Sequence, residues 1–143
     1  MPISGRAGVT RPRLLLVEDD ASVRRSLQLL LESRGYDVRA YGSGVGLQKD
    51  PEAMKAHCLV ADLVLGEGDG FDLIRELKKA GWTGSAVLIS GHSSPEVETR
   101  AMGEGYDLVL AKPLSDAVLT GSIARLISNG QRDSHLPSAG TKD

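Results

Sequence analysis

The feature that most constrains this chain is an alternation, repeated five times, between a short apolar run and a stretch of different periodicity. Short apolar runs suit strands that are buried on both faces, as in a parallel sheet. The runs cover residues 13–17, 36–41, 58–65, 85–90 and 108–111. Between and after them, helical spacing marks residues 21–33, 71–80, 95–102 and 115–128, whereas glycines and a proline interrupt residues 42–56. This order predicts an α/β fold with a parallel sheet, helices on both faces and right-handed crossovers.

Capping residues mark the ends of the predicted helices. Asp20, Ser94 and Ser115 stand where the side chain of an N-cap accepts a hydrogen bond from the first turn. Asn129 and Gly130 follow the last apolar residue of the final helix, so we expect that helix to end there.

The first and last helices have the clearest apolar faces. Val23, Leu27 and Leu31 recur at helical spacing in the first, and Val118 and Ile123 do so in the last. We expect all five side chains to pack on the sheet.

Composition favours one small domain in a reducing compartment. We expect a flexible arm over residues 1–12, a domain over residues 13–129 and a flexible tail over residues 130–143. The net charge of −2 provides no general attraction to nucleic acid or anionic lipid, so direct contact with either is not expected. Cys58 is the only cysteine and lies in an apolar run, and no apolar stretch approaches the length of a membrane span. A cytoplasmic location is therefore expected.

Polar residues stand where four of the five predicted strands end. Glu18 and Asp19 follow the first strand, Asp62 lies near the end of the third, Ser90 ends the fourth, and Lys112 follows the fifth. In open α/β sheets the ligand binds beyond the carboxyl ends of the strands. All five side chains are thus expected to meet at one rim of the sheet.

The chemistry of this rim suggests phosphoryl transfer. At ~4 Å and an effective dielectric constant of about 20, each pair of like charges among Glu18, Asp19 and Asp62 costs roughly 4 kcal/mol. Mg²⁺ would relieve this repulsion, because it binds hard oxygen ligands and keeps several waters. Asp62 is then a candidate nucleophile that forms an aspartyl phosphate. Lys112 offers a positive charge and Ser90 a hydroxyl donor to the phosphoryl oxygens.

Four segments at these positions, LLLVEDD, VADLVLGEGDGFDL, VLISGH and AKP, resemble the receiver domains of two-component response regulators. The resemblance covers about residues 13–129 and implies a flavodoxin-like, doubly wound sheet of five strands in the order 2-1-3-4-5. It also implies that Asp62 is the phosphoacceptor, with Ser90 and Lys112 contacting the phosphoryl group. Mg²⁺ would be bound by Asp19, Asp62 and the main-chain carbonyl of Val64, and through water by Glu18. The bond between Lys112 and its following proline would be cis.

The resemblance further implies a signalling switch rather than a metabolic enzyme. The phosphoryl donor would be a histidine kinase or a histidine phosphotransfer protein. The output would be a partner protein or a homodimer, bound at the face made by the fourth helix, fifth strand and fifth helix.

Three positions depart from the family pattern. Gly66 stands where receivers usually have proline, which predicts a more flexible loop after Asp62. Val109 stands where many receivers have the aromatic ring that moves inward on activation, and valine is too short and too stiff for that movement. Tyr106 replaces a residue that is often small, and whether it or His92 takes over the role of the ring is open.

Other functions remain possible on sequence grounds. A phosphatase with an Asp nucleophile commonly has a second acid two residues later, where this chain has Val64. A third reading is an interaction module that keeps the fold without phosphorylation. Within the receiver reading we expect a stand-alone regulator, with a fragment of a larger DNA-binding regulator as the alternative. Trp82 is expected to pack in the core, and Asp69 to shape a turn.

Overall fold

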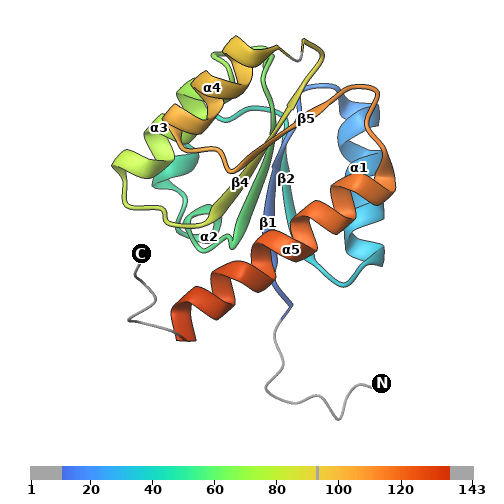
Figure 1. Cartoon of the computed structure of the whole chain (residues 1–143), viewed down its shortest axis with the longest axis vertical. Helices are drawn as coiled ribbons and strands as arrows, with labels where there is room; N and C mark the ends of the chain where they lie inside the picture. The colour runs from blue at the N-terminus through green and yellow to red at the C-terminus, as the bar shows by residue number, and fades with distance from the viewer. Residues whose placement is uncertain (1–10, 93, 136–143) are drawn as a thin grey trace.

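Strands and helices alternate along the chain as the sequence predicts (Figure 1). The computed structural model describes residues 11–92 and 94–135. The elements are β1 (Arg13–Val17), α1 (Ala21–Ser33), β2 (Asp37–Tyr41), the 3-10 turn η2 (Leu47–Lys49), α2 (Pro51–Met54), β3 (Cys58–Asp62), α3 (Gly70–Lys79), β4 (Ser85–Ser90), α4 (Pro95–Glu104), β5 (Leu108–Ala111) and α5 (Asp116–His135).

The five strands form one parallel sheet in the order β2-β1-β3-β4-β5, which confirms the predicted topology. Figure 1 shows α1 and α5 on one side of the sheet and α2, α3 and α4 on the other. β3 lies at the centre and all five of its residues are buried, whereas β2 at the edge is only partly buried. The apolar character of each strand therefore follows its place in the sheet.

Successive residues of a strand pack into opposite layers. Leu15 of β1 belongs to the core beneath α2, α3 and α4, and its neighbour Leu16 belongs to the core beneath α1 and α5. Neither leucine is more than 1% exposed. The sheet thus separates two apolar cores that share the same strands.

The predicted N-caps are confirmed. The carboxylate of Asp20 accepts hydrogen bonds from the amides of Ser22 and Val23, at 3.0 and 3.1 Å. Ser94 and Ser115 accept in the same way at the starts of α4 and α5. These bonds satisfy amides that have no partner within the helix.

The prediction for the third strand was too long, because β3 ends at Asp62 rather than Leu65. Leu65 is nevertheless only 7% exposed, since the loop after the strand folds it back into the core. A buried loop residue extended the apolar pattern beyond the strand, and periodicity alone does not separate the two cases.

The prediction that the last helix ends at Asn129 and Gly130 was wrong, because α5 continues to His135. Gly130 does not take the positive φ by which glycine commonly ends a helix. Glycine inside a helix is unfavourable but tolerated. Residues 1–10 and 136–143, which carry most of the predicted arm and tail, lie outside the described residues.

Two side chains predicted to be buried are exposed. Val23 is 42% exposed and Val118 is 51% exposed, whereas Leu27, Leu31 and Ile123 pack on the sheet as expected. Both valines lie in the first turn of a helix, beside the edge where the strands end. Leu119, the next residue of α5, is fully buried, so Val118 lies on the side of that helix that faces away from the sheet.

None of the described helices combines the length and apolar character needed to cross a lipid bilayer.

Candidate functional site

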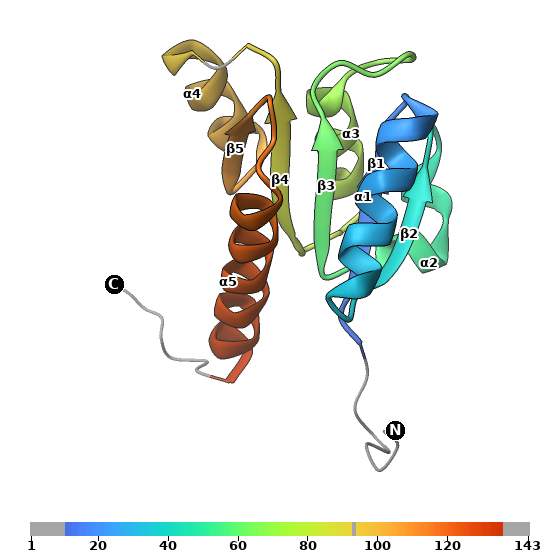
Figure 2. The ribbon, with the colours of Figure 1, turned by 90° about the vertical axis from the view of Figure 1, so that its right-hand side faces the viewer.

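The carboxyl ends of the strands meet at one edge of the sheet, where the loops after β3 and β4 rise (Figure 2). Register places Val17 of β1 beside Ala61, Asp62 beside Ile89, and Ser90 beside Ala111. The residues that follow β1 and β5 therefore flank Asp62 at the end of β3. This edge is called the rim below.

Asp62 lies at the centre of the rim and is only 3% exposed. Its Oδ1 accepts a hydrogen bond from the amide of Val64 at 3.0 Å, and its Oδ2 lies 2.5 Å from Nζ of Lys112. The hydrogen bond to Asp62 raises the pKa of Lys112, which keeps the ammonium charged. A buried carboxylate would be costly without these partners. Asp62 and Lys112 thus meet at the rim, as the sequence predicted, and the bond from Lys112 to Pro113 is cis, as the resemblance implied.

Glu18 is the second buried acid of the rim, with 4% exposure. Its carboxylate accepts a hydrogen bond from the amide of Asp20 at 3.0 Å. Burial raises the pKa of Glu18 to about 7, and the neighbouring charge of Asp62 adds to this rise. Two acids are thus held together at the rim, as the sequence predicted.

Asp19 is exposed at the other side of the site, next to the loop after β3. A Cβ atom on Gly66 would lie 3.6 Å from Oδ2 of Asp19. Among the described residues, no three His, Cys, Asp or Glu side chains converge closely enough to hold a metal ion. The predicted crowding of three acids is therefore looser than expected, with Glu18 buried against Asp62 and Asp19 open to solvent.

The donor set still fits Mg²⁺. This ion commonly uses only one or two protein carboxylates and takes its remaining ligands from water and phosphate oxygens. The hydrogen bond and charge of Asp62, together with the charge of Asp19, raise the pKa of Lys112, so both carboxylates act on the same ammonium group. A set of hard oxygens with an open side is the arrangement that this ion requires.

Ser90 and Val64 lie at the rim in orientations that the sequence did not predict. The hydroxyl of Ser90 donates to the carbonyl of His92 at 2.8 Å and accepts from the amide of His92 at 3.1 Å. It is therefore engaged within its own loop. The side chain of Val64 is 70% exposed, and the residue pairs with Asp69 in an isolated antiparallel bridge. Asp69 caps α3 through a reciprocal bond with Asp72.

Sequence reasoning assigned no role to Arg24, which supports the acidic loop. Its guanidinium donates to the carbonyl of Glu18 at 2.7 Å. A Cβ atom on Gly42 would lie 2.9 Å from the same guanidinium, so glycine leaves room for this side chain. The available signal was the position of Arg24 in the first turns of α1, six residues after Glu18.

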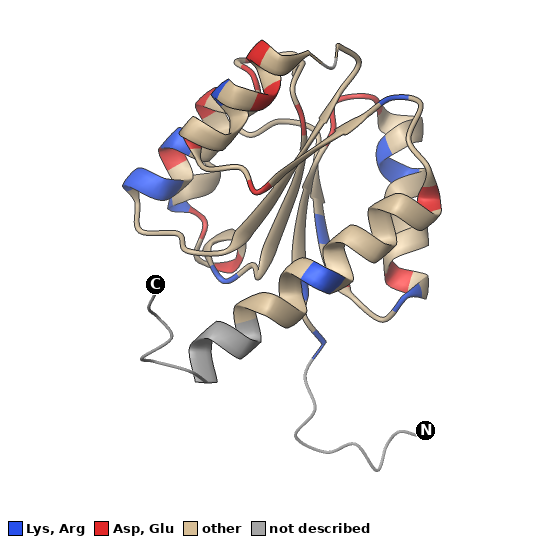
Figure 3. Cartoon of the chain, in the orientation of Figure 1, with Lys and Arg blue, Asp and Glu red and all other residues tan. Residues whose placement is uncertain are grey.

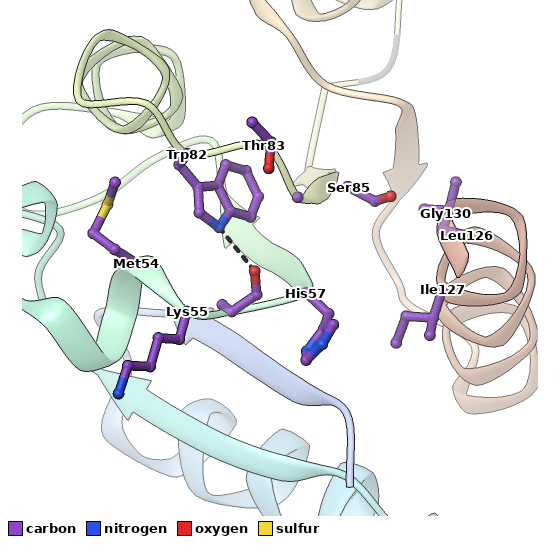
Figure 4. A pocket seen from close by; sticks show the side chains of 11 residues that line it. Met54, Lys55, His57, Trp82, Thr83, Ser85, Leu126, Ile127 and Gly130 are labelled. Carbon is purple, nitrogen blue, oxygen red and sulfur yellow. Dashed lines mark hydrogen bonds between the residues drawn. The ribbon is translucent and has the colours of Figure 1, made fainter. Parts of the chain in front are cut away.

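A hollow at the opposite edge of the sheet does not have the chemistry of the rim. It has a volume of about 320 Å³ and is lined by His57, Trp82 and Leu126, among others, with no Asp or Glu in its described lining (Figure 4). Trp82 is 3% exposed and its indole donates to the carbonyl of Ala56 at 2.9 Å, which confirms that it packs in the core.

A family model for the response regulator receiver domain matches residues 14–124. The chain belongs to this family. Receiver domains are signalling domains of two-component systems rather than classical enzymes. The predicted family and the flavodoxin-like fold are therefore confirmed.

Curated relatives of this receiver domain are longer than the chain itself. Nodulation protein W of Bradyrhizobium diazoefficiens is 33% identical over 114 residues, which cover 80% of this chain and 50% of that protein. The transcriptional regulatory protein FixJ of Azorhizobium caulinodans is 29% identical over 108 residues, which cover 76% and 51%. The chain thus spans about half the length of these relatives.

Solved receiver structures share the fold. The signal receiver domain of a putative Luxo repressor protein from Vibrio parahaemolyticus superposes with a TM-score of 0.81 at 23% identity, covering 89% of this chain and 98% of that one. The non-phosphorylated HemR receiver domain from Leptospira biflexa gives a TM-score of 0.74 at 27% identity, covering 82% and 95%.

Proposed function

We propose that this receiver domain accepts a phosphoryl group on Asp62 in an Mg²⁺-dependent reaction, and that the modification switches its binding to partners. The observation that carries the proposal is the Asp62 carboxylate, buried at the end of the central strand between the Val64 amide and the Lys112 ammonium. The proposed donor is a histidine kinase or a histidine phosphotransfer protein, as expected for a member of this family.

The proposed transfer uses few groups. One oxygen of Asp62 forms a bond to phosphorus while the bond from phosphorus to the donor breaks, and the donor keeps that electron pair. Lys112 contacts Oδ2 of Asp62, and from there its ammonium would stabilise the negative charge on a phosphoryl oxygen. Ser90 would donate to another phosphoryl oxygen after rotating away from His92.

The proposed metal ligands are Asp19, Asp62 and the carbonyl of Val64, with Glu18 acting through water. A bound Mg²⁺ would neutralise the negative charge that builds up on the phosphoryl oxygens. Asp19 and Asp62 would hold the ion from two strand ends. The burial of Glu18 beside Asp62 supports a role in which it does not bind the ion directly.

The first test is labelling with acetyl phosphate, followed by intact-mass measurement or a phosphate-affinity gel. Wild-type protein should gain one phosphoryl group with Mg²⁺ and none with EDTA. Asp62→Asn should lose all labelling, whereas Asp116→Asn, which changes an exposed aspartate in the first turn of α5, should be labelled like wild type. Asp19→Asn should need a higher Mg²⁺ concentration. Undiminished labelling of Asp62→Asn would reject the assigned site.

The proposed output surface is the α4–β5–α5 face, used for a partner protein or a homodimer. β5 is an edge strand, and Leu108, Val109 and Leu110 are only partly buried. Met102 on α4 is 54% exposed and Val118 on α5 is 51% exposed. These exposed or partly exposed apolar side chains on α4, β5 and α5 support a protein contact rather than direct binding of nucleic acid.

The cellular compartment of this domain and its state as a stand-alone or fused protein are further parts of the proposal. A single buried thiol, Cys58, supports the expected reducing, cytoplasmic compartment. The stand-alone regulator expected from the sequence stays a prediction. The match to about half of the transcriptional regulatory protein FixJ favours the alternative, a receiver joined to a DNA-binding output domain. The full reading frame of the gene would distinguish the two.

A further inference from the structure

Tyr106 connects the end of α4 to the start of α3 through a buried hydrogen bond. It is 2% exposed and lies between the C-cap of α4 and the first residue of β5. Its hydroxyl donates to the carbonyl of Gly70 at 2.7 Å. Burial raises the pKa of this hydroxyl, so it stays protonated and remains a donor.

Gly70 is in turn packed against the strand that carries Asp62. A Cβ atom on Gly70 would lie 2.9 Å from the carbonyl of Asp62, 3.2 Å from Cα of Leu63 and 2.7 Å from Cδ1 of Leu88. The amide of Gly70 also donates to the carbonyl of Leu63 at 2.9 Å. Gly70 therefore closes the loop that begins immediately after Asp62.

The loop between Leu63 and Gly70 is anchored in the core by Leu65, and Asp69 near its far end caps α3. Val64 is tied to the Asp62 carboxylate and to Asp69, but residues 64 and 66–68 are exposed. Glycine at positions 66 and 68 widens the range of backbone conformations available to it. The position of its far end thus depends on the contacts of Gly70 together with the cap made by Asp69.

Tyr106 follows the end of α4, which several contacts hold against α3. The guanidinium of Arg75 on α3 binds Glu104 on α4 through two hydrogen bonds, at 2.9 and 3.3 Å. Arg100 of α4 lies 4.3 Å above the ring of Phe71 on α3. The amide of Tyr106 donates to the carbonyl of Ala101 at 2.9 Å. Figure 3 shows that α3 and α4 lie together and carry charges of both signs.

We propose that Tyr106 is a positioning residue for the phosphoacceptor loop. Its hydroxyl holds Gly70, and through Gly70 it keeps Val64 in place beside the Asp62 carboxylate. The predicted effects of Tyr106 on Mg²⁺ binding and on phosphorylation rest on the proposed function. The predicted effect of Tyr106 on the loop does not. Val109 has no aromatic ring. Tyr106 is the aromatic side chain that joins the end of α4 to this loop, through its bond to Gly70.

The test is the variant Tyr106→Phe, which removes the hydroxyl and keeps the ring. Amide hydrogen exchange of residues 64–70, followed by NMR without Mg²⁺, should become about fivefold faster, as expected for one lost hydrogen bond. A calorimetric titration should show the Kd for Mg²⁺ raised by about threefold or more, because a mobile loop binds less well. The rate of labelling by acetyl phosphate at low Mg²⁺ should fall in parallel.

Tyr41→Phe is the matched control, since it removes another tyrosine hydroxyl, one that donates to Asp50 at 3.0 Å. It should change neither the exchange of residues 64–70 nor the Kd for Mg²⁺. A second variant, Glu104→Gln, weakens the link to Arg75 from the surface without altering the core. It should accelerate exchange of the same amides by a smaller factor. Because this change lies at the surface, the test does not depend on whether Tyr106→Phe folds stably.

Unchanged exchange of residues 64–70 in both Tyr106→Phe and Glu104→Gln would overturn the proposal, as would an equal effect of Tyr41→Phe. Faster exchange with an unchanged Kd for Mg²⁺ would reject the positioning role at the site. If wild-type protein is not labelled on Asp62 while the exchange effect is present, the proposed function fails and the loop contact stands.

Discussion

At the scale of single residues, the rim holds two buried acids that have different hydrogen-bond partners. Asp62 and Glu18 are almost equally buried, yet Asp62 has the Lys112 ammonium on one oxygen and the Val64 amide on the other. Burial raises the pKa of Glu18 and the repulsion of Asp62 adds to the rise, while the hydrogen bond from one backbone amide opposes it. Two carboxylates thus meet different environments within one site.

Cys58 gives a prediction at this scale. The thiol is fully buried, and burial raises its pKa to about 12. Only the thiolate reacts readily, and at pH 8 roughly one molecule in ten thousand would carry it. Ellman's reagent should therefore react very slowly with the native protein and rapidly in concentrated urea. Prompt reaction of the native protein at pH 8 would contradict the burial of this side chain.

At the scale of elements, glycines with different surroundings serve different purposes. Gly70 begins α3 in direct contact with the end of β3, so a side chain there has no room. Gly121 lies within α5, where a Cβ atom would meet no atom within 4 Å. The first glycine is required by packing, whereas the second only weakens the helix.

Alanine substitutions at these two positions should therefore have opposite signs. Gly70→Ala should lower the free energy of unfolding by about 1–3 kcal/mol, because the added methyl group must displace backbone and Leu88. Gly121→Ala should raise it by about 0.5–1 kcal/mol, through the better helix propensity of alanine. Urea denaturation followed by circular dichroism measures both. Equal effects of the two substitutions would show that the close contact of Gly70 is not required.

At the scale of the whole molecule, one sheet serves two apolar cores. Leu15 and Leu16 are neighbours in β1 and point into opposite layers. The only tryptophan, Trp82, lies in the layer of α2, α3 and α4 and therefore reports on that core. Because every strand contributes to both layers, we expect the two cores to unfold together.

Leu15→Ala and Leu16→Ala should each reduce the free energy of unfolding by about 2–5 kcal/mol, since each removes a fully buried side chain. In Leu16→Ala, the urea transition followed by Trp82 fluorescence should coincide with the one followed by circular dichroism, although the change lies in the other core. Two separate transitions, with the Trp82 transition at its wild-type midpoint, would mean that the layers unfold independently.

The sequence pattern by itself determined the order of strands and helices, the parallel sheet and the rim on which the candidate site lies, whereas the resemblance to receiver domains supplied the strand order. Parallel strands that are buried on both faces have continuous apolar sequences, which makes them recognisable. Their carboxyl ends also lie at one edge of the sheet. The end of β3 and the length of α5 were misjudged, since a buried loop residue such as Leu65 and a helical Gly130 carry no local signal.

Only the tertiary structure decided how side chains from distant segments meet. The sequence predicted that Lys112 and Asp62 lie at the same rim, and the structure adds their direct contact, whereas the bond from Tyr106 to the carbonyl of Gly70, 36 positions away, had no signal in the sequence. The same holds for Ser90, whose hydroxyl is engaged by its own loop, and for Asp19, which lies beside Gly66 apart from the buried acids. Such contacts depend on rotamers and on packing between layers, and neither is encoded in the periodicity of any one segment.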